Sequence, residues 1–225
     1  MKAKLFQSAT SLLLAAVLIL SGHINVSAAS AEALEPRVSE IASDYRIAFQ
    51  AVVFAGKRVG LDTAAEFLDH SLDDEPRNLV YGPTTEYAAQ ILNSSELSTI
   101  TQKFIAAVSG KNLTYYRMTG TTTLDSTLDL MLAYNNVSYA VTGNITTFRK
   151  WSLTITITDT YDFKYTDWLT AITEVDATAV LNNLGAKAQS VGAIVPYDIQ
   201  LTVNTTVLER NIETNRLDIP AQLQK

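Results

Sequence analysis

The sequence predicts an α+β fold, with about four N-terminal helices packed on a mostly antiparallel sheet that also carries one late helix. Apolar residues between positions 36 and 109 recur every three or four residues, which is typical of helices. After Gly110 the apolar spacing changes to two, which is typical of strands, and one further helical segment precedes the last strand. Helices first and strands later is the order expected of an α+β domain.

The strongest strand signal covers residues 151–158. Apolar side chains alternate there with hydroxyl side chains: Trp151, Leu153, Ile155 and Ile157 with Ser152, Thr154, Thr156 and Thr158. Such alternation indicates a strand with one buried face and one face open to water. We expect helices from the first half of the chain to cover the apolar face.

The predicted helices have recognisable ends. A first helix follows the apolar spacing from Val38 to Ala55. The pattern Thr63-Ala-Ala-Glu66 has the form of a capping box and predicts a short helix through Ser71. Two more helices should end near Leu92 and at Gly110; Thr84 is the expected cap of the former, and Ser94 or Ser95 that of the latter.

The second half predicts consecutive strands joined by tight turns. Expected strands cover residues 112–118, 128–134, 137–141, 145–148, 151–158 and 197–209, with turns at Asn135-Asn136 and Gly143-Asn144. Asp176 opens the late helix, and Gly192 ends it.

The N-terminus predicts a secretory signal peptide over residues 1–31. Lys2 and Lys4 precede the apolar run Leu12–Leu20, and small-residue cleavage sites end at Ala28 and Ala31. The run is too short to span a bilayer, although an uncleaved N-terminal anchor is the alternative. We therefore expect a secreted chain with no membrane span after cleavage. Residues 32–225 then form a single α+β domain, divided into 32–110 (helical part), 111–210 (sheet part) and 211–225 (tail).

Composition narrows the function classes. The formal net charge of −6 disfavours nucleic acid and anionic membranes as partners, because both require a clustered positive field. The chain has no cysteine, which excludes disulfides, a thiol nucleophile and thiolate metal sites. The expected partner is an unknown protein or a component of the cell envelope.

Three polar side chains gather where the strongest strand ends: Asp159, Tyr161 and Asp162. We regard them as candidate catalytic residues. Asp159, Asp162 and Asp167 could also supply oxygen ligands to a divalent cation such as Ca²⁺ or Mg²⁺, although no other cofactor is expected. The alternative is a strand-end turn in which Asp159 binds nearby backbone amides.

His70 is the fourth candidate catalytic residue. It lies between Asp69 and the pair Asp73-Asp74, so a carboxylate could orient its ring as a general base. The alternative is a surface histidine at the end of a helix.

Short motifs resemble known families. Asp159–Phe163, Leu181–Gly185, Ala188-Gln189 and Gly192–Ile199 resemble segments of uncharacterised exported proteins and toxin-tip domains of Gram-positive bacteria. This resemblance implies export and an α+β domain but no known activity. Asp159-x-Tyr161-Asp162 is also similar to the Asp-x-Tyr-Asp core of colicin-M-like bacteriocins, which cleave a lipid-linked peptidoglycan precursor. In that family a His-Arg pair follows, whereas residues 165–169 of this chain contain neither residue type.

Two classes of function remain. The sequence contains no clear nucleophile–base pair, metal motif or cofactor fingerprint, which favours a non-catalytic exported protein that binds a partner or an envelope component. The alternative is a secreted hydrolase or antibacterial effector that uses the Asp159, Tyr161 and Asp162 cluster, with or without a divalent metal.

Overall fold

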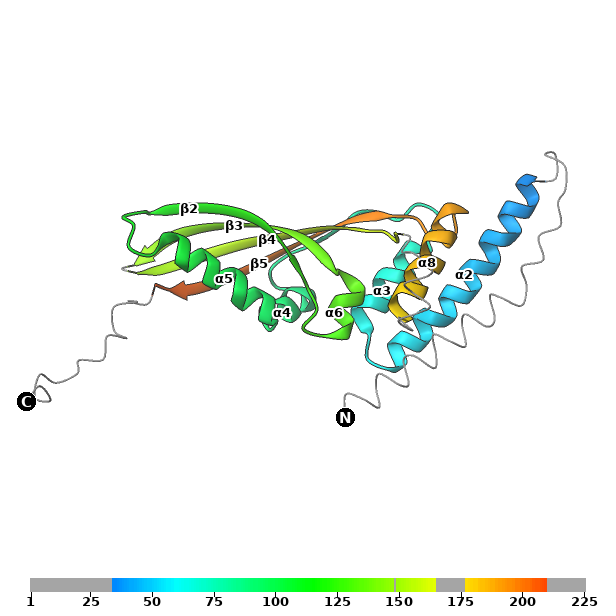
Figure 1. Cartoon of the computed structure of the whole chain (residues 1–225), viewed down its shortest axis with the longest axis horizontal. Helices are drawn as coiled ribbons and strands as arrows, with labels where there is room; N and C mark the ends of the chain where they lie inside the picture. The colour runs from blue at the N-terminus through cyan, green and yellow to red at the C-terminus, as the bar shows by residue number, and fades with distance from the viewer. Residues whose placement is uncertain (1–33, 148, 165–176, 210–225) are drawn as a thin grey trace, which may run out of the picture.

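The computed structural model describes residues 34–147, 149–164 and 177–209 (Figure 1). The predicted leader and C-terminal tail, as well as Asp167, lie outside these residues. The described helices are α2 (Leu34–Arg58), α3 (Asp62–Ser71), α4 (Glu86–Leu92), α5 (Ser95–Val108), α6 (Leu128–Ala133) and α8 (Ala177–Ser190). The strands are β1 (Leu79–Tyr81), β2 (Tyr115–Thr123), β3 (Asn136–Thr147), β4 (Lys150–Tyr161) and β5 (Tyr197–Leu208). None of the described helices is long and apolar enough to cross a bilayer.

The strands form one five-stranded sheet in the order β1-β5-β4-β3-β2. Three of the strand pairs are antiparallel: β2 with β3, β3 with β4, and β4 with β5. The pair of β1 with β5 is parallel. Figure 1 shows α4, α5 and α6 along the sheet, while α2, α3 and α8 gather at the end where β4 stops and β5 begins. The α+β prediction is confirmed.

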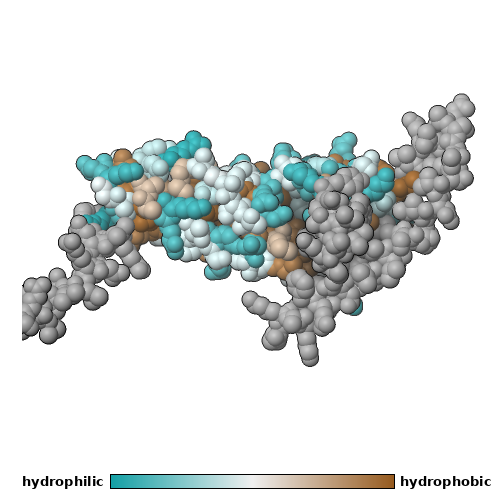
Figure 2. Space-filling view, in the orientation of Figure 1, coloured by the Kyte–Doolittle hydropathy of each residue, from teal (hydrophilic) through white to brown (hydrophobic). Residues whose placement is uncertain are grey.

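The central strand β4 buries the predicted face. Trp151, Leu153, Ile155 and Ile157 are all essentially inaccessible to solvent, and Val141, Val203 and Leu201 lie beside them on β3 and β5. The α5 side chains Ile100 and Phe104 belong to the same buried cluster, so this helix covers the apolar face. Figure 2 shows the resulting surface, in which apolar residues appear only as small patches among hydrophilic and neutral ones.

Residues 128–133 form the helix α6, and Tyr134 ends it, so the strand predicted over residues 128–134 is wrong. Thr127 caps it, because the Leu130 N–H donates to the Thr127 hydroxyl oxygen at 3.1 Å. Leu130 and Ala133, three positions apart, are the buried residues of the helix. Leu128, Leu130 and Leu132 alternate as in a strand, but Leu128 and Leu132 also have the four-residue spacing of a helix. The cap at Thr127 favours the helix. The strand predicted over residues 112–118 is β2, which starts later, at Tyr115, and runs to Thr123. The short strand β1 (Leu79–Tyr81) was not predicted.

Gly143 and Asn144 lie inside β3, so the predicted turn at these residues is wrong. Gly143 is on the core face, where an added Cβ would collide with Cζ of Phe104. The glycine therefore makes room for the Phe104 ring, which packs against Trp151 at 5.4 Å between centroids. The hairpin between β3 and β4 instead contains Arg149, which has a φ of 59°.

The predicted capping box at Thr63 is also wrong. α3 begins at Asp62, and its N-cap residue makes no side-chain hydrogen bond. The backbone N–H groups of Thr63 and Ala64 instead donate to the carboxylate of Asp129 on α6, at 3.2 and 2.8 Å. A residue distant in sequence thus satisfies the start of α3, which ties two helices together. The cap of α4 is Thr85 and not Thr84, whereas α5 is capped by Ser94, one of the two predicted candidates.

A buried carboxylate fixes the loop between β2 and α6. Glu96, on the first turn of α5, is 7% exposed. Its Oε1 accepts the backbone N–H groups of Asp125 and Ser126 at 2.9 and 2.6 Å. Burial alone would raise the pKa of Glu96, but these and other hydrogen bonds to the carboxylate outweigh it and lower the pKa to about 2.

Candidate functional site

Asp159 is the polar residue on the buried side of the β4 end. Ile157 and Tyr161, two positions before and after it, both point into the core, and alternation gives Asp159 the same orientation. Burial raises the pKa of Asp159 to about 7, with a further increase from the charge of Asp162; the N–H of Thr160, which donates at 2.9 Å, opposes this shift, as does Lys164. Burial therefore favours the protonated form of Asp159 much more than that of an ordinary aspartate.

Tyr161 lies in the core and is 7% exposed. Its ring stacks on Tyr197 at 5.5 Å and meets the edges of Phe67 and Phe163 at 6.2 and 5.5 Å. Burial raises the pKa of its hydroxyl. The structure thus places Tyr161 next to Asp159 along the strand, but within an aromatic cluster and not in the open.

Asp162 lies just beyond the strand and is partly exposed. Its Oδ2 is 3.4 Å from the ammonium group of Lys164. The next residue, Phe163, is tied to α8, because its N–H donates to Oε1 of Gln189 at 3.1 Å and its ring fills the space above Gly185. The strand end is therefore anchored to α8.

The predicted metal ligands are only partly described. Asp159 and Asp162 lie three residues apart at the strand end, and Asp167 lies outside the described residues. Within the part of the chain that the structure describes, no three acidic or histidine side chains gather closely enough to hold a metal ion.

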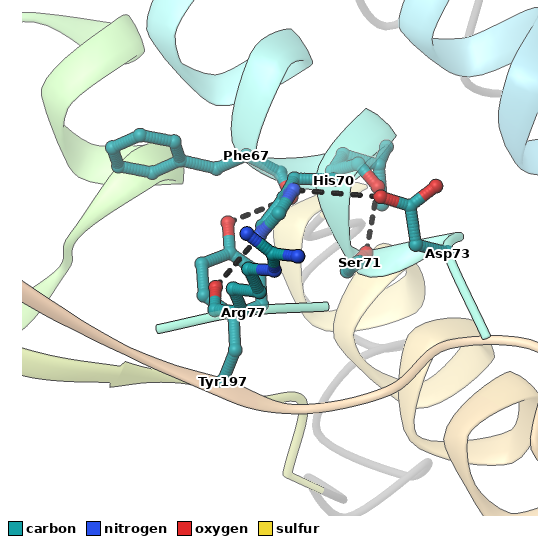
Figure 3. A network of polar contacts seen from close by, with 7 residues as sticks. Phe67, His70, Ser71, Asp73, Arg77 and Tyr197 are labelled. Carbon is teal, nitrogen blue, oxygen red and sulfur yellow. Dashed lines mark hydrogen bonds and ion pairs between the residues drawn. The ribbon is translucent and has the colours of Figure 1, made fainter. Parts of the chain in front are cut away.

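His70 lies at the end of α3 and reaches the same aromatic cluster (Figure 3). Its ring meets Tyr197 edge-on at 4.6 Å, and Tyr161 stacks against Tyr197 at 5.5 Å. The His70 Nε2 is 2.8 Å from the Arg77 carbonyl oxygen, so this nitrogen carries a proton. Its Nδ1 is 3.6 Å from a carboxylate oxygen of Asp73. Both ring nitrogens thus face oxygen atoms of the loop after α3.

Tyr197, which the sequence did not single out, joins these candidates. Its hydroxyl donates to the Phe67 carbonyl oxygen at 2.9 Å (Figure 3). Its ring contacts the rings of both His70 and Tyr161. Tyr197 opens β5 and pairs with Tyr161 in the sheet register. The strand predicted over residues 197–209 includes Tyr197. Its contact with Tyr161, however, depends on the pairing of β5 with β4, which a local sequence pattern does not show.

A second group of tyrosines surrounds Phe67 beside Asp159. The Phe67 ring centroid lies 5.2 to 6.2 Å from those of Tyr81, Tyr87 and Tyr134. Tyr134 is 3% exposed, and its hydroxyl has no hydrogen-bond partner among the described residues. Burial raises the pKa of Tyr134, followed by smaller effects of several neighbours that include Asp159. The spacing of the tyrosines in the sequence did not predict that Tyr81, Tyr87 and Tyr134 pack around Phe67.

Comparisons with known proteins found a distant likeness in structure. No family model matches the chain, and no curated protein matches its sequence. A truncated form of the bacteriocin syringacin M from Pseudomonas syringae pv. tomato DC3000 is 13% identical, with a TM-score of 0.35, over 89% of this chain and 96% of that chain. Longer syringacin M and a point mutant of it are each 12% identical, with TM-scores of 0.34, over 89% of this chain and 84% of theirs. Values of this size carry no functional conclusion.

Proposed function

We propose that this chain is an exported hydrolase in which Asp159 moves the proton during the reaction. The observation that carries this proposal is the half-buried Asp159 carboxyl at the end of β4, whose pKa of about 7 lies far above the usual range of an aspartate. A carboxyl whose pKa lies near neutral pH can both donate and accept a proton, which is what general acid–base catalysis requires.

The neighbouring residues have distinct proposed roles. Asp162 is the second carboxylate, and its charge helps to keep the proton on Asp159. Tyr161 acts through packing, because its buried ring holds the strand end against Tyr197. His70 supports the other side of Tyr197, and the contacts of its nitrogens with the 73–77 loop favour this positioning role over proton transfer. A divalent cation held by Asp159, Asp162 and Asp167 would add Lewis-acid assistance when bound.

The test is hydrolysis of a lipid-linked peptidoglycan precursor, the substrate implied by the Asp-x-Tyr-Asp resemblance. The secreted chain, residues 32–225, should release a water-soluble product at a rate that changes near pH 7. Asp159→Asn should lower this rate by about 10²- to 10⁴-fold and remove the inflection near pH 7. Asp44→Asn, a change in an exposed aspartate of α2, is the matched control and should leave the rate unchanged.

Full activity in Asp159→Asn would contradict the assigned role. A wild-type chain that releases no product, with or without added Mg²⁺ or Ca²⁺, would contradict hydrolysis of this substrate.

The second candidate function is a non-catalytic module that binds an envelope component. The outer face of the sheet supports it, because no described helix covers that face, and uncharged polar side chains run across its strands: Ser152, Thr154, Thr158, Gln200, Asn204 and Thr206. Such a face offers many hydrogen-bonding groups to a neutral polymer and little attraction to a charged one.

A binding experiment separates this function from hydrolysis. The secreted chain should sediment with purified cell-wall material, and the pair of changes Thr154→Lys and Thr158→Lys should weaken this retention about tenfold, because two strongly hydrated charges then occupy the face. Gln50→Lys on the exposed side of α2 adds a charge elsewhere and should have no effect. Equal retention of all these variants would contradict a binding role for the outer face.

A further inference from the structure

The strand β2 forms one edge of the sheet. It runs for nine residues and pairs along its whole length with β3 on one side. No described strand pairs with its other side, as Figure 1 also shows. The strand at the opposite edge, β1, is only three residues long.

The register shows which backbone groups of β2 face the open side. The Ile145 N–H donates to the Thr114 carbonyl at 2.9 Å, and the Leu124 N–H donates to the Asn135 carbonyl at 2.7 Å. Both bonds join directly opposed residues, so even-numbered positions of β2 exchange hydrogen bonds with β3. The N–H and C=O groups of the odd-numbered positions therefore point to the open side. These positions are Tyr115, Arg117, Thr119, Thr121 and Thr123.

This edge lacks the features that usually prevent pairing between chains. Edge strands are commonly protected by shortness, by proline or lysine residues, or by a bulge. β2 contains no proline and no lysine, and its register with β3 continues without a shift from Tyr115 to Thr123. Its single charged residue is Arg117, whose side chain points to the outer face. The open side is therefore a regular row of donors and acceptors.

We propose that two copies of this chain associate by antiparallel pairing of β2 with β2 of the second copy, about a two-fold axis at Thr119. In this register, each outward N–H of one copy meets an outward C=O of the other. The two Thr119 residues face each other, and Arg117 faces Thr121 of the second copy, so no like charges are opposed. The association joins two five-stranded sheets into one continuous sheet.

The free part of β5 is the competing partner for this edge. β1 pairs only with residues 199–201 of β5, which leaves residues 202–208 without a strand on that side among the described residues. Pairing of β2 with this segment of another copy would be heterologous and would extend into a polymer. The self-complementary register of β2, in which no like charges are opposed, favours the closed pair.

The first test is the change Thr119→Pro in the secreted chain. Proline removes the outward N–H of Thr119, which the fold does not use, and proline is tolerated on edge strands when its nitrogen faces solvent. Light scattering after size exclusion should give the mass of two chains for the wild type and one chain for Thr119→Pro. Thr119→Val keeps the N–H and the branched side chain, so it should keep the mass of two chains.

A second pair of variants tests the position of the axis without changing the backbone. Thr119→Lys places two ammonium groups opposite each other at the axis and should give single chains at low salt, with partial recovery at high salt. Thr123→Lys places its charge opposite Tyr115 of the second copy and should leave the mass of two chains. Thr119→Lys therefore decides the proposal if Thr119→Pro fails to fold.

Three outcomes would overturn this inference. The first is a wild-type chain that has the mass of one chain over a wide concentration range. The second is a folded Thr119→Lys or Thr119→Pro variant that keeps the mass of two chains at low salt. The third is a wild-type mass that grows without limit, which would indicate pairing of β2 with β5 or aggregation.

Discussion

Replacing Ile155 with aspartate should abolish folding. Ile155 is 0% exposed and lies on the central strand β4, opposite Val141 on β3 and Val203 on β5. A carboxylate at this position would lose its hydration without gaining a charged partner. The cost, even after protonation, is several kcal/mol, which is comparable with the whole stability of a typical domain. Far-UV circular dichroism should therefore show no cooperative thermal transition for this variant.

The control for this prediction is the next residue. Thr154 is exposed on the opposite face of the same strand, so Thr154→Asp should change the free energy of unfolding by less than about 1 kcal/mol. A cooperative, wild-type-like melt of Ile155→Asp would show that the buried face of the sheet has been assigned wrongly.

Removing the carboxylate of Glu96 should lower the free energy of unfolding by about 2–4 kcal/mol. Glu96→Ala leaves the N–H groups of Asp125 and Ser126 without their acceptor and frees the loop that leads into α6. Urea denaturation should show the loss directly. Glu86→Ala removes an exposed glutamate from the first turn of α4 and should cost no more than about 1 kcal/mol.

The pH dependence gives an independent check on Glu96. Its pKa falls from 4.5 to about 2 on folding, so its contribution is complete above pH 4.5 and is lost as the pH falls toward 2. A shift of this size corresponds to about 3 kcal/mol. The wild type should therefore lose stability more steeply than Glu96→Ala in this pH range. Parallel curves for the two proteins would contradict the low pKa.

The sequence predicted those parts of the fold that depend on local pattern. The alternation over residues 151–158 predicted both the position and the buried face of β4, and Ser94 predicted the start of α5. The failures have tertiary causes. The start of α3 depends on Asp129, which is 66 residues from Thr63, and Gly143 is inside a strand because the Phe104 ring needs its space. No local pattern contains either interaction.

The candidate site was likewise predictable only where it depends on local sequence pattern. Asp159, Tyr161 and Asp162 were found because polar residues at the end of an alternating strand stand out in a sequence. Tyr197 became visible only through its pairing with Tyr161, and Tyr134 only through the packing of α6 on α3. The proximity of His70 to these residues likewise depends on Tyr197, 127 positions farther along the chain.

The position of β5 has a consequence for how the protein acquires its structure. In the sheet, β5 lies between β1 and β4. Leu79 of β1 pairs with Ile199 of β5, so these two neighbouring strands are far apart in the sequence. The sheet is therefore incomplete until residues 197–208 have been synthesised, and such non-local pairing slows folding.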